Sequence, residues 1–340
     1  MKKNILICWI AILALGLIYS YGFTADKKLA QTGFQFLSVV TEARAAAMGD
    51  AFTTVEGNSM SLFFNPANLA LMNTFMDLSI NQNKWIADMT HYSASIAFNP
   101  MYGKYGTFGL TLLSVDYGDF IGTMVDPTTE KGFIDTGTFG PTAFAIGFGY
   151  AKALTDRFSV GGHIRYVDQK LGSSTVPVGE VSEGVTKEVN NDLSVWSFDF
   201  GTIYRTGFKS LVFGMSVRNF SQEVKFESEG FQLPLTFKMG ISMDVFDLLM
   251  ENNAQHKLLV SVDAVHPRDY SEQLNFGAEY TMMNLLAFRL GYMYNRDEED
   301  ITAGFGVQTK FGDRMVALDY AYTPFGVFNN VQRLSFRLSL

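Results

Sequence analysis

The sequence predicts an all-β fold: a transmembrane antiparallel β-barrel of about 14 strands, with a partly helical hatch, or plug, inside it. Most of the chain alternates apolar and polar residues in segments of about ten residues, as barrel strands do. The N-terminal region has the layout of a secretory signal peptide. No later segment has the roughly 18 apolar residues in a row that a membrane helix needs. We expect a signal peptide at residues 1–25, the hatch at 26–74 and the barrel at 75–340.

The signal peptide is predicted from charge and hydrophobicity. Lys2 and Lys3 precede an apolar run at 5–19, and a short polar region follows it. The run is too short and too one-sided to be preferred as a membrane-spanning helix. Cleavage after Gly22 or Ala25 fits the residues there.

Composition narrows the function classes. The only cysteine, Cys8, lies in the apolar run, so we expect a mature chain without disulfides, thiolate metal sites or a cysteine nucleophile. Loss of Lys2 and Lys3 takes the formal charge from −8 to −10, and an acidic chain without a basic cluster argues against nucleic-acid binding. A secreted chain with 14% aromatic and only 18% charged residues is typical of an outer-membrane barrel in contact with lipid. The predicted location is the cell outer membrane.

The hatch is predicted from residues 43–72, which are rich in Ala and Met and show no period of two. Glu42 can begin a short helix that Gly49 ends. Asn65 can bond its own backbone in a turn, and Pro66 fixes the next dihedral angle. We therefore expect a sharp bend at Asn65 and Pro66, and we place Arg44, Asn65 and Pro66 in the hatch as candidate gating residues.

The alternation also predicts which face of the wall meets lipid. At 286–294, for example, Leu286, Phe288 and Leu290 alternate with Ala287 and Arg289. A barrel of about 14 strands is too wide for side chains to fill as a dry core, so its apolar face must meet lipid and its polar face must line the interior.

Loop lengths predict two unlike rims. Short turns are expected at 99–104, 152–156, 207–210, 282–284 and 312–313, and long loops at 118–138, 171–191 and 221–232. Short periplasmic turns and longer outer loops are the expected asymmetry. An even strand count would put both ends of the mature chain in the periplasm.

Charged residues at inward positions form the predicted lumen network. One interpretation is a hydrated network that pins the hatch, and the other is a ligand path in which buried charges orient a carboxylate or a peptide. Arg44 is a candidate partner for one of the wall acids. The inward charges are Arg165, Asp199, Arg218, Lys238, Asp244, Glu279, Arg289, Asp319 and Arg337.

Enzyme and cofactor chemistry finds no support in the residues. The four histidines are scattered without metal-ligand spacing, and the acidic run at 297–300 is better explained as a solvated turn than as a Ca²⁺ site. A phospholipase-type enzyme lacks a Ser/His pair on one strand face. We expect no catalytic residues, no cofactor and no metal.

Short motifs in the predicted hatch and in the C-terminal part of the chain resemble those of a known family. The ordered set is similar to the PorV/PorQ family, within the FadL-like outer-membrane barrels, over essentially the whole mature chain. One departure is Glu56-Gly57-Asn58, where the family often has paired acidic residues. The motifs are Ala43-Arg44-Ala45, Met48-Gly49, Ala51-Phe52, Asn65-Pro66-Ala67, Gly277-Ala278-Glu279-Tyr280, Arg289-Leu290-Gly291-Tyr292 and Asp319-Tyr320-Ala321-Tyr322-Thr323-Pro324-Phe325-Gly326.

The resemblance implies a barrel of 14 strands with an N-terminal hatch, and two alternative functions. PorV-like members are non-enzymatic components of type IX protein secretion that shuttle cargo proteins from the translocon. FadL-like transporters pass hydrophobic small molecules, such as fatty acids, through the hatch and the wall. The first is our leading hypothesis and the second is the alternative.

Overall fold

The computed structural model describes residues 31–55, 57–178, 186–226, 229–249, 255–312, 314–328 and 330–340. The predicted signal peptide and the first five residues of the predicted hatch lie outside the described residues. Within the described segments, no helix combines the length and the apolar character needed to cross a membrane.

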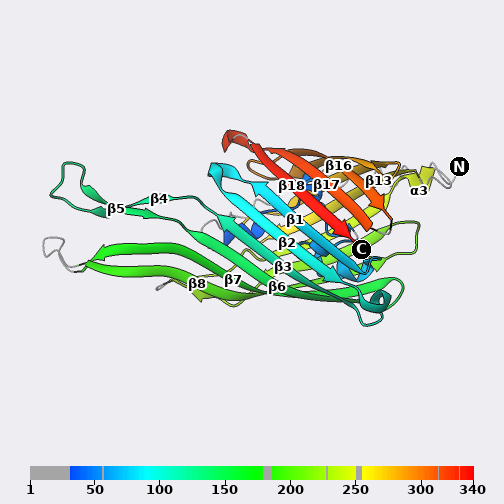
Figure 1. Ribbon diagram of the computed structural model, residues 1–340, viewed down its shortest axis with the longest axis horizontal. Helices are drawn as coiled ribbons and strands as arrows, with labels where there is room; N and C mark the ends of the chain where they lie inside the picture. Colours follow the sequence, from blue (N-terminus) through cyan, green and yellow to red (C-terminus); the bar gives the residue numbers. More distant parts are fainter. Residues whose placement is uncertain are drawn as a thin grey trace.

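The main structure is a closed barrel of 14 antiparallel strands, in which β1 pairs with β18 to complete the ring (Figure 1). The predicted fold class is therefore confirmed. The barrel strands are β1 (Met76–Lys84), β2 (Thr90–Phe98), β3 (Thr107–Asp116), β6 (Thr142–Ala153), β7 (Phe158–Pro177), β8 (Thr186–Arg205), β9 (Val212–Phe220), β12 (Thr236–Asp244), β13 (His256–Pro267), β14 (Gln273–Met282), β15 (Leu286–Tyr294), β16 (Ile301–Phe311), β17 (Arg314–Pro324) and β18 (Asn330–Ser339).

Burial alternates along the strands in the predicted sense. In β15, Phe288 and Leu290 are exposed on the outside, whereas Arg289 between them is 6% exposed and faces the interior. The outer surface presents an apolar face to lipid and the inner surface is polar, as a wide membrane barrel requires.

The two rims differ as the loop lengths predict, with one correction. The described residues of the 171–191 region, which was expected as a long loop, are almost all strand, because β7 and β8 run for 20 residues each and extend beyond the rim as a hairpin (Figure 1). The loop between β3 and β6 contains a second hairpin, β4 (Phe120–Val125) with β5 (Phe133–Phe139), and the loop between β9 and β12 contains β10 (Val224–Lys225) with β11 (Gly230–Phe231). We call this end the hairpin end and the opposite end the short-turn end.

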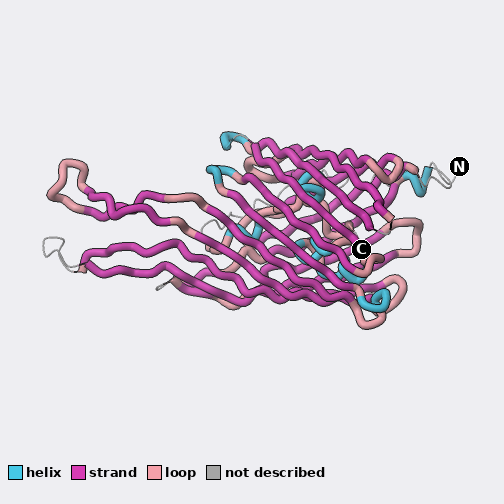
Figure 2. Tube along the Cα trace, viewed as in Figure 1, coloured by secondary structure: helices cyan, strands magenta, loops and turns pink. Residues whose placement is uncertain are grey.

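Short helical turns lie within the ring of strands and at its rims (Figure 2). The hatch contains four of them, and its apolar side chains Phe52, Met48 and Met60 are almost fully buried. The hatch helices are η1 (Gln35–Ser38), α2 (Ala43–Ala47), η2 (Ser59–Phe63) and η3 (Pro66–Leu71), and those at the rims are η4 (Ile86–Asp88), η5 (Pro100–Gly103), α3 (Phe246–Leu249) and η7 (Gly326–Phe328).

The hatch threads the barrel from one end to the other. Thr32 forms a bridge with Gln232 at the hairpin end, and its hydroxyl donates to Asp269 there. The segment reaches the short-turn end at Phe75, whose carbonyl accepts from Asn99 N–H just before β1. The 44 residues from Thr32 to Phe75 cross the lumen, so the first described residues lie at the hairpin end. The predicted mature N-terminus lies outside the described residues, and the expectation that both chain ends share one side stays a prediction.

Candidate functional site

The candidate site is the interface between the hatch and the inner face of the wall. Helix α2 begins at Glu42, whose carboxylate accepts from Ala45 N–H at 2.6 Å, and its small alanines let it lie against β15 to β18. Gly49 then turns the chain with a φ of 62°, a conformation that glycine adopts at low cost after a helix. Thr302 on the wall donates to the Ala47 carbonyl at 3.0 Å and accepts from Gly49 N–H at 3.1 Å. The end of α2 is thus fixed to β16.

A chain of alternating charges joins α2 to three strands of the wall. Arg44 donates from Nε and Nη2 to the two carboxylate oxygens of Glu279, at 2.7 and 2.6 Å. Glu279 also accepts from Arg289 at 2.5 Å, and Arg289 donates to Asp319 at 2.7 Å. We call these four residues the paired side, because two cations meet two anions. The wall acid that Arg44 contacts is Glu279.

A second set of contacts holds the segment that follows α2. Lys238 of β12 donates to Asp50 at 2.5 Å, and both side chains are buried. Asp263 of β13 accepts from the backbone N–H groups of Phe52 and Thr53, at 2.9 and 3.0 Å, and from the Thr53 hydroxyl. A carboxylate on the wall therefore satisfies backbone donors of the hatch that have no partner of their own.

The bend at Asn65 and Pro66 packs directly on the wall. The Asn65 side chain accepts from Ala67 N–H at 3.1 Å and donates to the carbonyls of Thr53 and Thr202, at 2.9 and 3.1 Å. A Cβ at Gly161 would lie 2.5 Å from the Pro66 backbone, and one at Gly201 would overlap the Asn65 amide. Glycines in β7 and β8 therefore let the bend approach the wall closely. The predicted sharp bend is present, and its gating role is a proposal.

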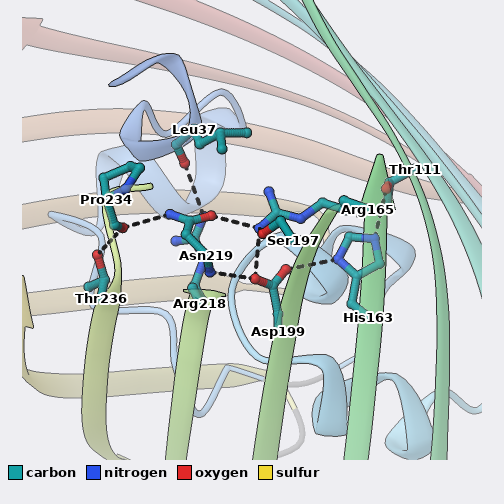
Figure 3. Close-up of polar contacts among 10 residues, drawn as sticks. All are labelled: Leu37, Thr111, His163, Arg165, Ser197, Asp199, Arg218, Asn219, Pro234 and Thr236. Atoms are coloured by element: carbon teal, nitrogen blue, oxygen red, sulfur yellow. Dashed lines mark hydrogen bonds and ion pairs between the residues drawn. The ribbon is translucent and has the colours of Figure 1, made fainter. Parts of the chain in front are cut away.

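Between β8 and β9, a β-bulge brings two consecutive side chains of β9 into the lumen. The register between β8 and β9 shifts between Phe198 and Phe200, so Asp199 faces both Arg218 and Asn219. Asn219 has a φ of 61°, a conformation that asparagine tolerates better than most residues. Figure 3 shows the resulting cluster below Leu37 of the hatch.

Asp199 is the centre of this cluster. It accepts from Arg165 at 2.7 Å and from Asn219 N–H at 2.7 Å, and Arg165 also donates to the Asn219 side chain at 2.6 Å. Arg218 has no carboxylate within ion-pair distance among the described residues; its Nη2 lies 3.5 Å from the Leu37 carbonyl. We call Arg165, Asp199, Arg218 and Asn219 the arginine side, because this cluster contains two arginines and one carboxylate.

A small cavity lies beside the two arginines. It has a volume of about 10 Å³, close to the space of one water molecule, and the Nε atoms of Arg165 and Arg218 have no hydrogen-bond partner among the described residues. Apart from Thr41, its other walls are apolar side chains, including Phe63 and Phe64 of the hatch and Leu113 of β3. The arginine side is therefore the less completely satisfied part of the interface.

Thr111, His163 and Asp199 line up in the order of a nucleophile, a base and an orienting acid. His163 Nε2 lies 2.9 Å from the Thr111 hydroxyl, and Nδ1 lies 3.1 Å from Asp199. All three residues are buried, however, and Phe63 of the hatch packs edge-on against the imidazole. Asp199 is also bound to Arg165. The arrangement satisfies buried polar groups and leaves no room for a substrate at the hydroxyl.

Other predicted residues have different surroundings. Arg337 lies 3.7 Å from Asp77, which also accepts from Ser59 N–H and the Ser339 hydroxyl. Asp244 faces away from the hatch contacts: it accepts from Phe246 N–H and Leu258 N–H, and so fixes the turn after β12. Within the described residues, no group of His, Cys, Asp and Glu has the geometry of a metal site.

Sequence reasoning missed several residues of the interface. Asp50, Asp263, His163 and Arg333 all contact the hatch or its network, and Arg333 donates to the Val40 carbonyl at 2.8 Å. Asp263 and Arg333 lie at inward positions of alternating segments, so the same period could have found them. Asn219 could not be found in this way, because the bulge reverses its expected direction.

One group of the hatch has a strongly shifted acidity. Burial raises the pKa of Glu42 to about 7, and the nearby Asp319 carboxylate adds to the rise, against the opposing effects of the Ala45 N–H, Arg44 and Arg289. Glu42 thus titrates near neutral pH at the start of α2.

Comparison with protein families identifies the chain. The family model described as type IX secretion system membrane protein PorP/SprF matches residues 135–339, more than half of the sequence. The chain belongs to the PorP/SprF family. A comparison with curated proteins finds no match.

The similar solved structures include two toluene transporters and a FadL homologue. The Ralstonia pickettii toluene transporter TbuX is 14% identical, with a TM-score of 0.54 over 91% of this chain and 98% of that one. The Pseudomonas putida toluene transporter TodX is 14% identical, with a TM-score of 0.55 over 88% and 96%. A Pseudomonas aeruginosa FadL homologue is 11% identical, with a TM-score of 0.53 over 88% and 98%. At these identities the likeness shows the fold alone.

The two comparisons agree with the sequence resemblance at a coarse level. This PorP/SprF protein is a membrane β-barrel resembling bacterial outer-membrane proteins, its family is a type IX secretion family, and its architecture is FadL-like. The family and the structural neighbours are secretion and transport barrels. The matching family model is PorP/SprF rather than PorV/PorQ, so the more specific assignment is not confirmed.

Proposed function

We propose that the protein is a non-enzymatic outer-membrane component of type IX secretion that binds cargo or machinery proteins at its outer hairpins, as PorV-type proteins do. The observation that carries the proposal is the pair of hairpins beyond the rim. Ile121 and Val125 of β4 are 70% and 64% exposed, and Val176 of β7 is 43% exposed. Exposed apolar side chains on a structure projecting past a membrane rim suit a protein partner.

The hatch supports the same proposal. It is joined to the wall by the buried ion pairs of Arg44 and Asp50 and by the Asp263 carboxylate, so the lumen is largely occupied by protein. A barrel of this kind can act as a platform whose working surface is outside the lumen.

The test is affinity purification of the tagged protein from its native outer membrane, followed by mass spectrometry, with a variant in which a Gly/Ser turn replaces residues 120–139. We expect a large translocon barrel, or secreted proteins with a shared C-terminal β-sandwich signal, to copurify with the full chain and not with the shortened one. The shortened barrel must retain the heat-modifiable gel mobility of a folded barrel. Recovery of a lone barrel that carries only lipid or fatty acid would reject the proposal.

The alternative is transport of hydrophobic small molecules, such as fatty acids, across the outer membrane. The arginine side favours it, because apolar side chains there adjoin two arginines, of which Arg165 is paired with a carboxylate and Arg218 is not. A carboxylate on an apolar chain would match both features, although the hatch would have to move to admit it. Saturable binding of dodecanoate to the purified barrel, lost in Arg218→Met, would favour this function.

A further inference from the structure

The short-turn end contains a larger cavity, which we call the vestibule. Its volume is about 660 Å³, within the roughly 300–1,000 Å³ of ligand pockets. Its walls come from the turn between β8 and β9 and from β12, β13 and β14, and the hatch residues Arg44, Thr54 and Val55 close its inner end. The vestibule therefore reaches the hatch from the side opposite the hairpins.

The vestibule carries positive charge at its mouth. Lys209 and Lys257 are exposed there, and neither makes an ion pair among the described residues. Of the nearby acids, Asp244 is engaged by two backbone N–H groups, and Glu279 is engaged by Arg44 and Arg289. Among the described acids that line the vestibule, only Asp247, exposed on α3, remains to balance the two lysines. Charge complementarity therefore favours an anionic occupant.

The inner end offers a cation and apolar contacts. Both hydrogen bonds from Arg44 to Glu279 use Nε and Nη2, so Nη1 is left for an occupant. Val55, Leu211 and Leu259 provide apolar surface between this end and the mouth. A purely apolar ligand would leave Arg44 Nη1 without a polar partner, at a cost in free energy.

We propose that the vestibule binds a short acidic segment of a partner polypeptide, in extended form, with carboxylates at the mouth and at Arg44. In an extended chain, side chains on one face recur at every second residue. Carboxylates can therefore face the cationic side chains of the vestibule while apolar groups face its apolar residues. The inference rests on the proposed function, under which this end faces the periplasm and the partner is a protein of the secretion machinery.

Occupation of the vestibule also affects the hatch. A carboxylate beside Arg44 competes with Glu279 for the same guanidinium, so binding weakens the ion pair that fixes α2 to β14. By linkage, any change that weakens the Arg44–Glu279 pair strengthens binding of the segment.

The experiment uses the purified full-length barrel in detergent and a fluorescein-labelled, acetylated heptapeptide of alternating glutamate and leucine, followed by fluorescence anisotropy. We expect saturable binding that weakens with salt and falls at least about tenfold in Lys209→Glu/Lys257→Glu, because each reversal replaces an attraction by a repulsion. The matched control is Lys104→Glu/Lys152→Glu, which changes the same total charge. These two lysines lie at the same end of the barrel and do not line the vestibule.

Three results would overturn the proposal: equal losses in both double variants, equal binding of a heptapeptide with lysine in place of glutamate, or displacement of the peptide by free glutamate at similar concentrations. Heat-modifiable gel mobility identifies variants that fail to fold, and Lys209→Gln/Lys257→Gln then replaces the reversal. Copurification from the native membrane can fail while the peptide still binds, so this result and the proposed function are judged separately.

Discussion

The paired side and the arginine side of the hatch interface both contain buried charges, but they differ in how many of these charges have an opposite charge nearby. On the paired side, Arg44 and Arg289 meet Glu279 and Asp319, and each of the four charges has an opposite charge within 2.7 Å. On the arginine side, Asp199 pairs with Arg165, while Arg218 has, among the described residues, only a carbonyl at 3.5 Å and the Phe64 ring at 5.9 Å.

The difference indicates where the hatch is held and where it can yield. Burying a charge removes it from water, at a cost in free energy that only a close opposite charge offsets. A fully paired network therefore resists opening of the hatch, whereas an incompletely paired one stabilises the closed hatch little. A water-sized cavity also lies on the arginine side. We infer that the paired side anchors the hatch and that opening begins at the arginine side.

The largest effect is expected on the paired side when Glu279, the carboxylate that Arg44 and Arg289 share, loses its charge. Glu279→Gln leaves Arg44 and Arg289 with one acid between them, and we expect the hatch-opening free energy to fall by about 3–5 kcal/mol. Hydrogen exchange of the α2 amides measures that free energy. Glu272→Gln is the control, because Glu272 is 64% exposed and pairs with His266 at the surface. Similar exchange in the two variants would show that the anchor lies elsewhere.

The second effect depends on pH and is located at Glu42. Its pKa in the folded state is about 7, against 4.5 for a free side chain, so between these values the folded state holds a proton that the open state loses. The stabilisation is complete below pH 4.5 and is lost as pH rises through 7, by up to about 3 kcal/mol. Comparing hydrogen exchange of the α2 amides in wild type and in Glu42→Gln across this pH window isolates the contribution of Glu42. Parallel pH profiles of the two proteins would contradict this prediction.

A smaller loss is expected for Arg44→Ala. Glu279 keeps Arg289 as a partner, so the change removes two charge-assisted hydrogen bonds without stranding the carboxylate, at a cost of about 1.5–3 kcal/mol. Leakage of a small solute through the reconstituted barrel should rise relative to wild type. Arg314→Ala, at an exposed strand end, should leave leakage unchanged. If leakage through Arg44→Ala stayed at the wild-type level, the ion pair would not control the hatch.

The paired side could be predicted from sequence to a large extent. Strict alternation in β14 and β15 places Glu279 and Arg289 inside, and an Ala-rich helix with one arginine needs a wall acid as partner. The pairing between strands follows from closure of an even antiparallel ring. What alternation could not supply is which acid Arg44 meets, because that depends on how far the hatch descends into the lumen.

The arginine side and the outer hairpin were less predictable, for two physical reasons. The bulge at Arg218 and Asn219 breaks the period of two, and no residue pattern marks it beforehand. Residues 171–178 and 186–191 lie beyond the rim, where no lipid requires an apolar face, so Ser173 and Ser174 can occupy a strand without the alternation that signals one. Lys209 lies in a turn, and nothing in the sequence around it indicates that it lines a cavity.

The smallest effect separates the two sides most sharply. Arg218→Met removes a buried cation that lacks a carboxylate and replaces it with an apolar chain of similar length, beside Leu37 and Phe64. Exchanging an incompletely paired buried charge for well-packed apolar atoms is often neutral or stabilising, so we expect a change within about 1 kcal/mol. Hydrogen exchange of the η2 and η3 amides provides the measurement, and Arg289→Met on the paired side should instead cost several kcal/mol, because it strands Asp319. Equal losses in the two variants would mean that Arg218 is held by interactions as strong as those of the anchor, and the two sides would then be equivalent.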